Sequence, residues 1–261
     1  MISIEQIIHS RTGQHLPRWA VYLLRRLLHE QRINLLLKSG QSLPPADFLR
    51  HVFRELEISS RVRFLSDLSA SDRYIFVANH PFGALDGMLL ADMLLREWSD
   101  VGVVVNDLLM HIEPLRPLWI PVNKFGRQSH PYLRLYHEAL ASSTRQILTF
   151  PAGLCSRFCD GRVTDLEWRD RFVRDAERYD RRIVPVYVDG ILSQRFYRLA
   201  RLRQALGIRF NVELLLLASE LFSQRGSEIT ITLSRPIDPH TLPGTPAQKC
   251  QLIRHEVYAM G

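Results

Sequence analysis

Short apolar runs alternate with amphipathic stretches along most of the chain. Residues 74–78, 101–105, 146–150 and 183–188 form apolar runs of strand length, and residues 228–234 alternate polar and apolar side chains. Between these runs, residues 88–95, 129–143 and 168–179 have the spacing of helices that bury one side. This order predicts an α/β fold, a single domain with a mostly parallel or mixed sheet flanked by helices.

Pro185 interrupts the apolar run 183–188. Because proline has no N–H group to donate to a neighbouring strand, we expect this run to be an edge strand or a bulged one.

The first sixty residues have a different pattern. They predict an N-terminal helical segment over residues 1–60, followed by the α/β domain over residues 61–261. Pro17 precedes a basic, amphipathic stretch that predicts one helix over residues 18–38, ended by Gly40. This stretch carries Trp19, so its apolar face either lies in a membrane interface or packs on its own domain.

The charge balance indicates which partners to expect. The 261 residues include 34 Lys and Arg against 27 Asp and Glu, a formal net charge of +7, and only three of the basic residues are Lys. A basic surface either is simply solvated or favours an anionic partner, such as a membrane, an acidic carrier protein, a phosphorylated acceptor or nucleic acid. No nucleic-acid partner is expected, because the chain has no basic run and no Cys/His finger spacing.

The cysteines and the hydropathy narrow the class of protein further. Cys155, Cys159 and Cys250 are an odd number, and only the first two are close in sequence, so we expect free thiols, a reducing compartment and no metal. The sequence begins without a secretory pattern, and no apolar run reaches the roughly 18 residues of a spanning helix. We therefore expect a cytoplasmic protein.

The strongest candidate for chemistry follows the apolar run 74–78. Asn79 and His80 begin a loop that also contains Gly83, and Asp86 stands at the start of the next predicted helix. Ligands gather beyond the carboxyl ends of the strands in open α/β sheets. His80 is therefore a candidate general base that Asp86 orients, or else Asp86 only caps the helix and His80 bonds to backbone.

A second loop of similar composition follows the apolar run 146–150. It contains Phe150, Pro151, Gly153, Ser156 and Arg157. If the two preceding strands are a parallel pair, the two loops open at the same edge of the sheet and face one another.

These loops resemble the motifs of the PlsC-like glycerolipid acyltransferase superfamily, over about residues 70–240. Asn79-His80 … Asp86 is similar to the first motif, with five intervening residues where four are usual. That spacing resembles the branch of hemolysin-like proteins and of O-acyltransferases of bacterial aminolipid synthesis, which make ornithine or glycine lipids. In the family, the His deprotonates an acceptor hydroxyl and the Asp orients the His.

The other motifs imply how substrates bind. Phe125 and Arg127 resemble the second motif, which lines the polar head of the acceptor, and the run around Pro185 resembles the fourth. Phe150-Pro151-x-Gly153 resembles the third motif, but Cys155 stands where relatives that acylate lysophosphatidate have a phosphate-binding Arg. The resemblance implies this set of substrate-binding residues: Asn79, Gly83, Phe125, Arg127, Phe150, Pro151, Gly153, Ser156 and Arg157.

The predicted function is transfer of a fatty acyl group from an acyl thioester to the hydroxyl of a lyso-lipid. The donor is acyl carrier protein or coenzyme A, no other cofactor is expected, and the protein is placed on the inner face of the membrane as a peripheral enzyme. The missing Arg favours a lyso-aminolipid acceptor over 1-acylglycerol 3-phosphate. The alternatives of another class are a hydrolase with Ser156 or Cys155 as nucleophile and a non-catalytic membrane-binding module.

Overall fold

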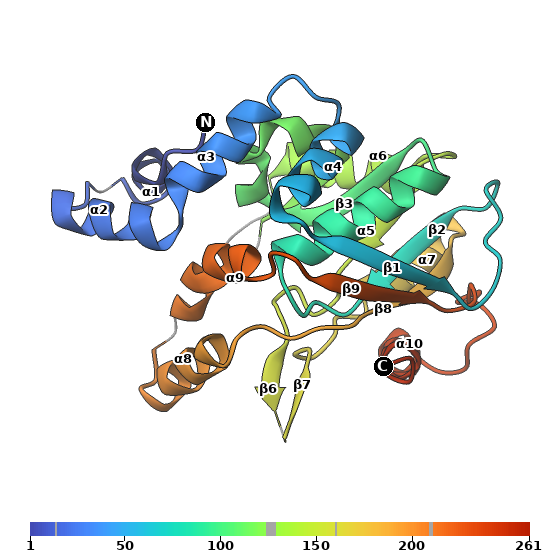
Figure 1. The fold of residues 1–261 in the computed structure, drawn as a ribbon. Coiled ribbons are helices and arrows are strands. Elements are labelled where there is room, and N and C mark those ends of the chain that lie inside the picture. The colour runs from blue at the N-terminus through green and yellow to red at the C-terminus, as the bar shows by residue number, and fades with distance from the viewer. Residues whose placement is uncertain (14, 124–128, 160, 209–210) are drawn as a thin grey trace.

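The computed structural model describes residues 1–13, 15–123, 129–159, 161–208 and 211–261. In this part of the chain a seven-stranded sheet has the order β1-β9-β8-β2-β5-β3-β4 (Figure 1). Its strands are β1 (Ser59–Phe64), β2 (Tyr74–Ala78), β3 (Val101–Asn106), β4 (Trp119–Val122), β5 (Gln146–Thr149), β8 (Arg182–Val188) and β9 (Glu228–Leu233). β8, β2, β5, β3 and β4 are parallel to one another, while β9 runs antiparallel to β8 and pairs in parallel with β1. The predicted α/β fold with a mixed sheet is confirmed.

Helices cover both faces of this sheet. Successive residues of the central strand β2 face opposite sides of the sheet, so they belong to two different cores. Tyr74 and Phe76 of β2 belong to one core with α4 (Pro45–Leu56) and α5 (Ala84–Glu97). Ile75 and Val77 belong to a second core with α6 (His130–Ala141), α7 (Arg171–Tyr179) and α10 (Pro246–Tyr258). A strand buried on both faces explains why residues 74–78 are apolar without alternation.

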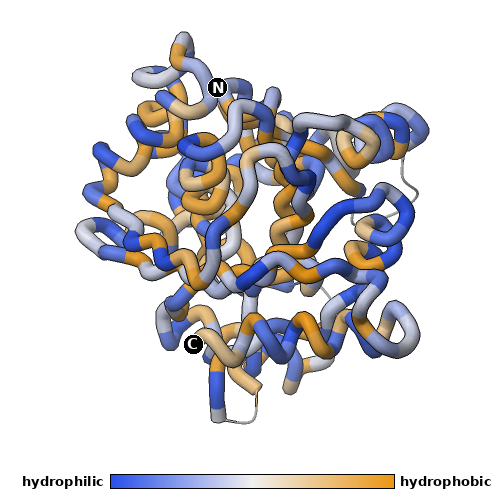
Figure 2. The backbone as a smooth tube through the Cα atoms, turned by 90° about the vertical axis from the view of Figure 1, so that its right-hand side faces the viewer, coloured by the Kyte–Doolittle hydropathy of each residue, from blue (hydrophilic) through white to orange (hydrophobic). Residues whose placement is uncertain are grey.

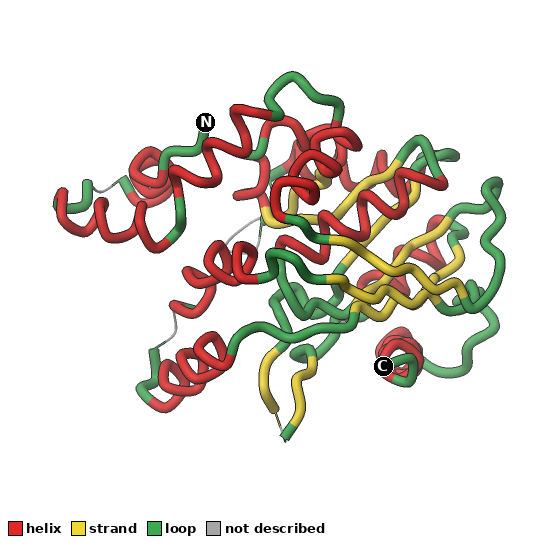
Figure 3. The backbone as a smooth tube through the Cα atoms, in the orientation of Figure 1, coloured by secondary structure: helices red, strands yellow, loops and turns green. Residues whose placement is uncertain are grey.

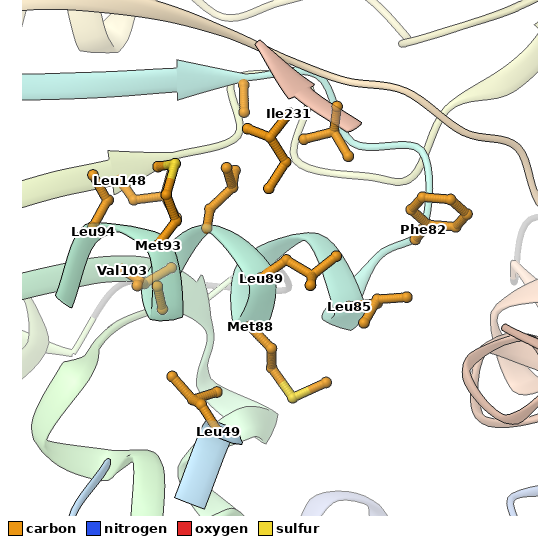
Figure 4. Close-up of a cluster of buried hydrophobic side chains, with 14 of the residues drawn as sticks. Leu49, Phe82, Leu85, Met88, Leu89, Met93, Leu94, Val103, Leu148 and Ile231 are labelled. Atoms are coloured by element: carbon orange, nitrogen blue, oxygen red, sulfur yellow. The ribbon is translucent and has the colours of Figure 1, made fainter. Parts of the chain in front are cut away.

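The contact between α5 and the sheet sets the position of the first loop. Leu89 and Leu94 on α5 lie toward the strand residues, while Met88 lies on the side of Leu49 of α4 (Figure 4). The helix is therefore apolar on two sides and fixed between the sheet and α4. Its first turn, which follows the His80 loop, has little freedom to move.

The predicted helix over residues 18–38 is wrong in one respect, because it is two helices. α1 (Ile4–Thr12) is followed by α2 (Arg18–Leu27) and α3 (Glu30–Ser39), which form an extension beside the sheet domain (Figures 1 and 3). His29 breaks the helix with a φ of 50°. Its Nε2 lies 2.9 Å from the hydroxyl of Ser219, and its ring packs on Phe222. A contact distant in sequence thus ends α2, and periodicity does not reveal it.

Pro185 lies in an internal strand, so the expected edge position is wrong, and the irregularity in the pairing lies on the partner strand and not in the run 183–188. β8 pairs with β9 at Val186↔Leu233, and the pairing resumes at the bridge Ile183↔Ile237. One extra residue therefore stands on the β9 side of the break. The carbonyl of Pro185 still accepts from the N–H of Ser234 at 2.9 Å, and the missing proline N–H falls where the ladder is interrupted.

The remaining elements lie at the ends of the sheet. They are the 3₁₀ helices η1 (Asp107–His111), η2 (Glu113–Leu118) and η3 (Val212–Leu216), the hairpin β6 (Arg157–Cys159) and β7 (Arg162–Thr164), α8 (Gln194–Ala205) and α9 (Leu217–Ser223). α8, η3 and α9 connect β8 to β9. Helices at the periphery carry hydrophilic and hydrophobic stretches side by side (Figure 2), as expected when one side is solvated.

Candidate active site

The two loops that the sequence singles out face one another. β2 and β5 are adjacent and parallel, with Ile75 opposite Ile147, so their following loops leave the same edge of the sheet. The imidazole ring of His80 stacks on the ring of Phe150, with centroids 4.2 Å apart and planes inclined by 30°. The expectation that the loops meet is therefore confirmed.

His80 and Asp86 come together across the turn that joins β2 to α5. Nδ1 of His80 lies 2.9 Å from Oδ2 of Asp86, although the ring is turned so that the N–H bond does not point straight at that oxygen. Asp86 is fully buried, whereas the His80 side chain keeps 16% of its surface exposed. The arrangement holds Nδ1 toward the carboxylate and leaves Nε2 as the ring nitrogen that can face a substrate.

Asp86 also organises the loop that carries His80. Its Oδ2 accepts hydrogen bonds from the N–H groups of Phe82 and Gly83, both at 2.9 Å. Asp86 thus caps the start of α5 and contacts His80 with the same oxygen, and its role in orienting a general base remains a prediction. Burial raises the pKa of the Asp86 carboxyl, and the contacts with His80 and the two amides oppose that rise.

Gly83 is required by this turn. Its φ is +82°, and a Cβ there would lie 3.0 Å from Sγ of Cys155 and 3.4 Å from the Leu217 side chain. A side chain at this position would push apart the two facing loops.

The side chain of Asn79 continues the pairing of β2 with β8 beyond the last paired residues of the two strands. Its amide donates to the carbonyl of Val188 at 2.9 Å and accepts from the Val188 N–H at 2.7 Å. The buried Asn79 therefore fixes the point where the His80 loop begins. A direct contact between Asn79 and substrate remains a prediction.

Asp165 also belongs to this group of residues, although sequence reasoning missed it. Its only local signal is the spacing of Asp165 and Trp168, which are three residues apart. Its Oδ1 accepts from the N–H of His80 at 3.1 Å and from the Ser156 hydroxyl at 2.6 Å, and its Oδ2 accepts from the Trp168 indole at 2.8 Å. The N–H of Ser156 in turn donates to the carbonyl of His80 at 2.8 Å. Both main-chain groups of His80 are thus held by the second loop and Asp165.

The residues proposed as hydrolase nucleophiles are both buried. The Ser156 hydroxyl donates to Asp165 and is not directed at His80. Cys155 lies against the Gly83 turn. A nucleophile whose proton is already given to a carboxylate other than the base does not form the arrangement of a hydrolytic triad.

The rest of the third motif shapes its own loop. The N–H of Gly153, whose φ is +65°, donates to the carbonyl of Phe150, and the carbonyl of Pro151 accepts from the N–H of Arg169. Arg157 is buried, and its guanidinium donates to the Cys155 carbonyl at 2.7 Å and to Glu213 at 2.9 Å. Phe125 and Arg127 lie outside the described residues, so their part in the site remains a prediction.

Within the ranges that the structure describes, no helix is long and apolar enough to cross a bilayer. The same ranges contain no group of three or more His, Cys, Asp and Glu side chains placed to hold a metal ion.

A family model described as Acyltransferase matches residues 7–260. The chain belongs to this acyltransferase family. Two curated relatives, both named "Lyso-glycine lipid O-acyltransferase", are similar over the whole chain. The protein from Phocaeicola vulgatus is 36% identical over 100% of this chain and 95% of its own length, and that from Bacteroides thetaiotaomicron is 35% identical over 100% and 97%.

Among solved structures, the acyltransferase chain is similar to the 1-acyl-sn-glycerophosphate (LPA) acyltransferase PlsC from Thermotoga maritima. That structure aligns with a TM-score of 0.48 and 16% identity over 92% of this chain and 94% of its own. The family match and the two curated relatives confirm the predicted superfamily and branch.

Proposed function

We propose that this acyltransferase moves a fatty acyl group from an acyl thioester to the hydroxyl group of a lyso-aminolipid, in glycine or ornithine lipid synthesis. The observation that carries the proposal is the His80–Asp86 pair at the carboxyl end of β2, with Nδ1 turned to the buried carboxylate. Two relatives that cover the full chain are named for the same reaction on a lyso-glycine lipid.

In the proposed reaction, Nε2 of His80 takes the proton of the acceptor hydroxyl while the hydroxyl oxygen attacks the thioester carbonyl. The new C–O bond forms, the C–S bond breaks, and the thiolate leaves with the proton from His80. Asp86 keeps the imidazole in the tautomer that leaves Nε2 unprotonated and stabilises the imidazolium. The amides of Gly83 and Gly153 already donate within the protein, so the oxyanion must find other donors.

The choice of acceptor follows from the charges beside the second loop. Cys155 stands at the position of the phosphate-binding Arg of other relatives, and Arg157 is occupied by Glu213 at 2.9 Å. Cys155 offers a phosphate group no positive charge, and the Arg157 guanidinium is already paired with a carboxylate. These features support an acceptor without phosphate, and Phe125 and Arg127 are proposed to line its head group.

We also propose that the enzyme is peripheral on the inner face of the membrane, through α2. This helix exposes Trp19 and Tyr22 at 71% and 67%, with Leu23 beside them and Arg25 and Arg26 nearby. Aromatic side chains flanked by Arg are typical of a helix lying in the headgroup region of an anionic bilayer. Of the two possibilities for the N-terminal segment, the exposed face of α2 supports the membrane interface.

The test is an assay with labelled acyl thioester and a panel of lyso-lipids with and without phosphate, comparing the wild type with His80→Ala. We expect transfer to lyso-glycine or lyso-ornithine lipid by the wild type and none by the variant, with unchanged thermal unfolding. Transfer only to 1-acylglycerol 3-phosphate would refute the proposed acceptor. Release of free fatty acid without any acceptor would support a hydrolase instead.

A further inference from the structure

The helix α8 has an exposed face that the proposed chemistry does not use. Arg195, Arg198, Leu202 and Leu206 follow one another at helical spacing, and the two leucines are 55% and 64% exposed. The opposite face packs into the protein through buried Phe196. Large aliphatic side chains in a row on an exposed helix mark a surface that a partner covers.

The charged side chains of α8 itself are all positive. Residues 194–205 contain four Arg and no Asp or Glu. Arg195, Arg198 and Arg201 are exposed, and Arg201 stacks over the ring of Phe158 on the β6–β7 hairpin at 4.3 Å. A partner that fits this surface is therefore acidic and brings apolar side chains of its own.

The same helix is joined to the catalytic loops by buried contacts. Glu213 accepts from Arg157 at 2.9 Å and lies 3.0 Å from Nε of Arg203, which belongs to α8. Arg157 directly follows Ser156, whose N–H holds the His80 carbonyl. The α8 face is thus anchored to the segment that positions the general base.

We propose that this α8 face docks an acidic acyl carrier protein, which delivers the acyl thioester on its flexible prosthetic arm; the inference rests on the proposed acyl transfer. Free acyl coenzyme A fits less well, because a nucleotide with phosphates does not cover a row of aliphatic side chains. A bilayer fits less well too, because this face lacks the exposed Trp and Tyr of α2. Arg is enriched at protein interfaces and Lys is depleted, and the cationic residues of α8 are all Arg.

The test compares an acyl carrier protein thioester with the acyl-pantetheine thioester of the same chain length, which lacks the protein and its phosphate link. In Arg195→Glu/Arg198→Glu, we expect kcat/KM for the carrier-bound donor to fall about 10-fold to 100-fold, since like charges then face each other. The rate with acyl-pantetheine should stay within about twofold, because His80 and its loops are untouched. The matched control is Arg174→Glu/Arg178→Glu on α7, which changes the net charge equally on the other side of the sheet.

A second pair of variants separates the apolar contribution. Leu202→Ser/Leu206→Ser should lower kcat/KM for the carrier-bound donor, whereas Leu65→Ser, at an exposed leucine just after β1, should not. Equal use of both donors by the wild type would overturn the inference, and so would unchanged carrier kinetics in the α8 variants. Loss of binding to phosphatidylglycerol vesicles with unchanged carrier kinetics would overturn it in favour of a bilayer. If no thioester acylates any lyso-lipid, the proposed function fails instead.

Discussion

Replacing Asp165 by Asn tests whether hydrogen bonds to this carboxylate hold the main chain of His80, the proposed general base. Asp and Asn side chains have the same size, so the substitution changes hydrogen bonding and charge without leaving a cavity. In the wild type, one carboxylate oxygen accepts from the N–H of His80 and the hydroxyl of Ser156, and the other accepts from the indole of Trp168. An Asn side chain offers only one acceptor oxygen. Whichever way it is turned, its NH₂ group meets an N–H or O–H donor.

The loss of stability in Asp165→Asn follows from that count of donors. At least one buried donor loses its acceptor, which costs about 1–3 kcal/mol of unfolding free energy. If the unpaired donor is the His80 N–H, the main chain of the base shifts, and a displacement of about 1 Å lowers kcat by about 10²-fold. The KM for the acceptor should change little, because Asp165 reaches the reaction only through the main chain of His80.

The assay measures kcat, KM and the free energy of unfolding for Asp165→Asn beside Asp175→Asn. Asp175 is also buried, but its carboxylate accepts from the hydroxyl of Tyr136 and not from the main chain of His80. Its loss should destabilise the protein while kcat stays within about twofold of the wild type. Equal losses of kcat in both variants, or a normal kcat in Asp165→Ala, which removes both acceptor oxygens, would refute the positioning role.

Three further outcomes follow from the structure. Asp86→Asn should abolish transfer, yet the variant should be more stable than the wild type at neutral pH. Burial raises the pKa of Asp86 in the folded protein, so the wild type loses stability when Asp86 ionises as the pH rises through that pKa. Asn does not ionise and avoids this loss. In urea unfolding, the difference in unfolding free energy between Asp86→Asn and the wild type should disappear as the pH falls below 3.8, the ordinary pKa of an Asp carboxyl. A difference that does not change with pH would contradict this explanation. Gly83→Ala should lose about 1–3 kcal/mol and much of kcat, whereas Gly161→Ala, with the same φ but open space around it, should lose stability alone. Arg181→Met should cost at least about 3 kcal/mol in a denaturant titration, because the buried guanidinium donates to five backbone carbonyls, whereas exposed Arg182→Met should cost little.

The contact between His80 and Asp86 could be predicted because the two residues are close in sequence. His80 and Asp86 are separated by one turn and the start of one helix, so the strand ending at Ala78 and the helix beginning at Ala84 bring them together. The facing of the two loops also followed, since it needs only that β2 and β5 are parallel neighbours. The motif at Phe150 is then opposite His80.

Other parts of the site depend on contacts between distant segments. Asp165 reaches His80 across 85 residues, and Glu213 reaches Arg157 across 56. The turn at His29, which splits the N-terminal helix, contacts Ser219 across 190 residues. Propensity and periodicity act over a few residues, so no local pattern marks these partners.

The amino-acid order alone therefore specified the alternating strands and helices, the contact of His80 with Asp86, and the acyltransferase motifs, because each is encoded within a few residues or one helical turn. Only the tertiary structure decided that Pro185 lies inside the sheet, that Arg157 is neutralised by Glu213, and that Asp165 holds the main chain of His80. The physical reason is that strand order and connections across the sheet bring these groups together, and the energy of a buried ion pair or hydrogen bond depends on partners that the local sequence does not name.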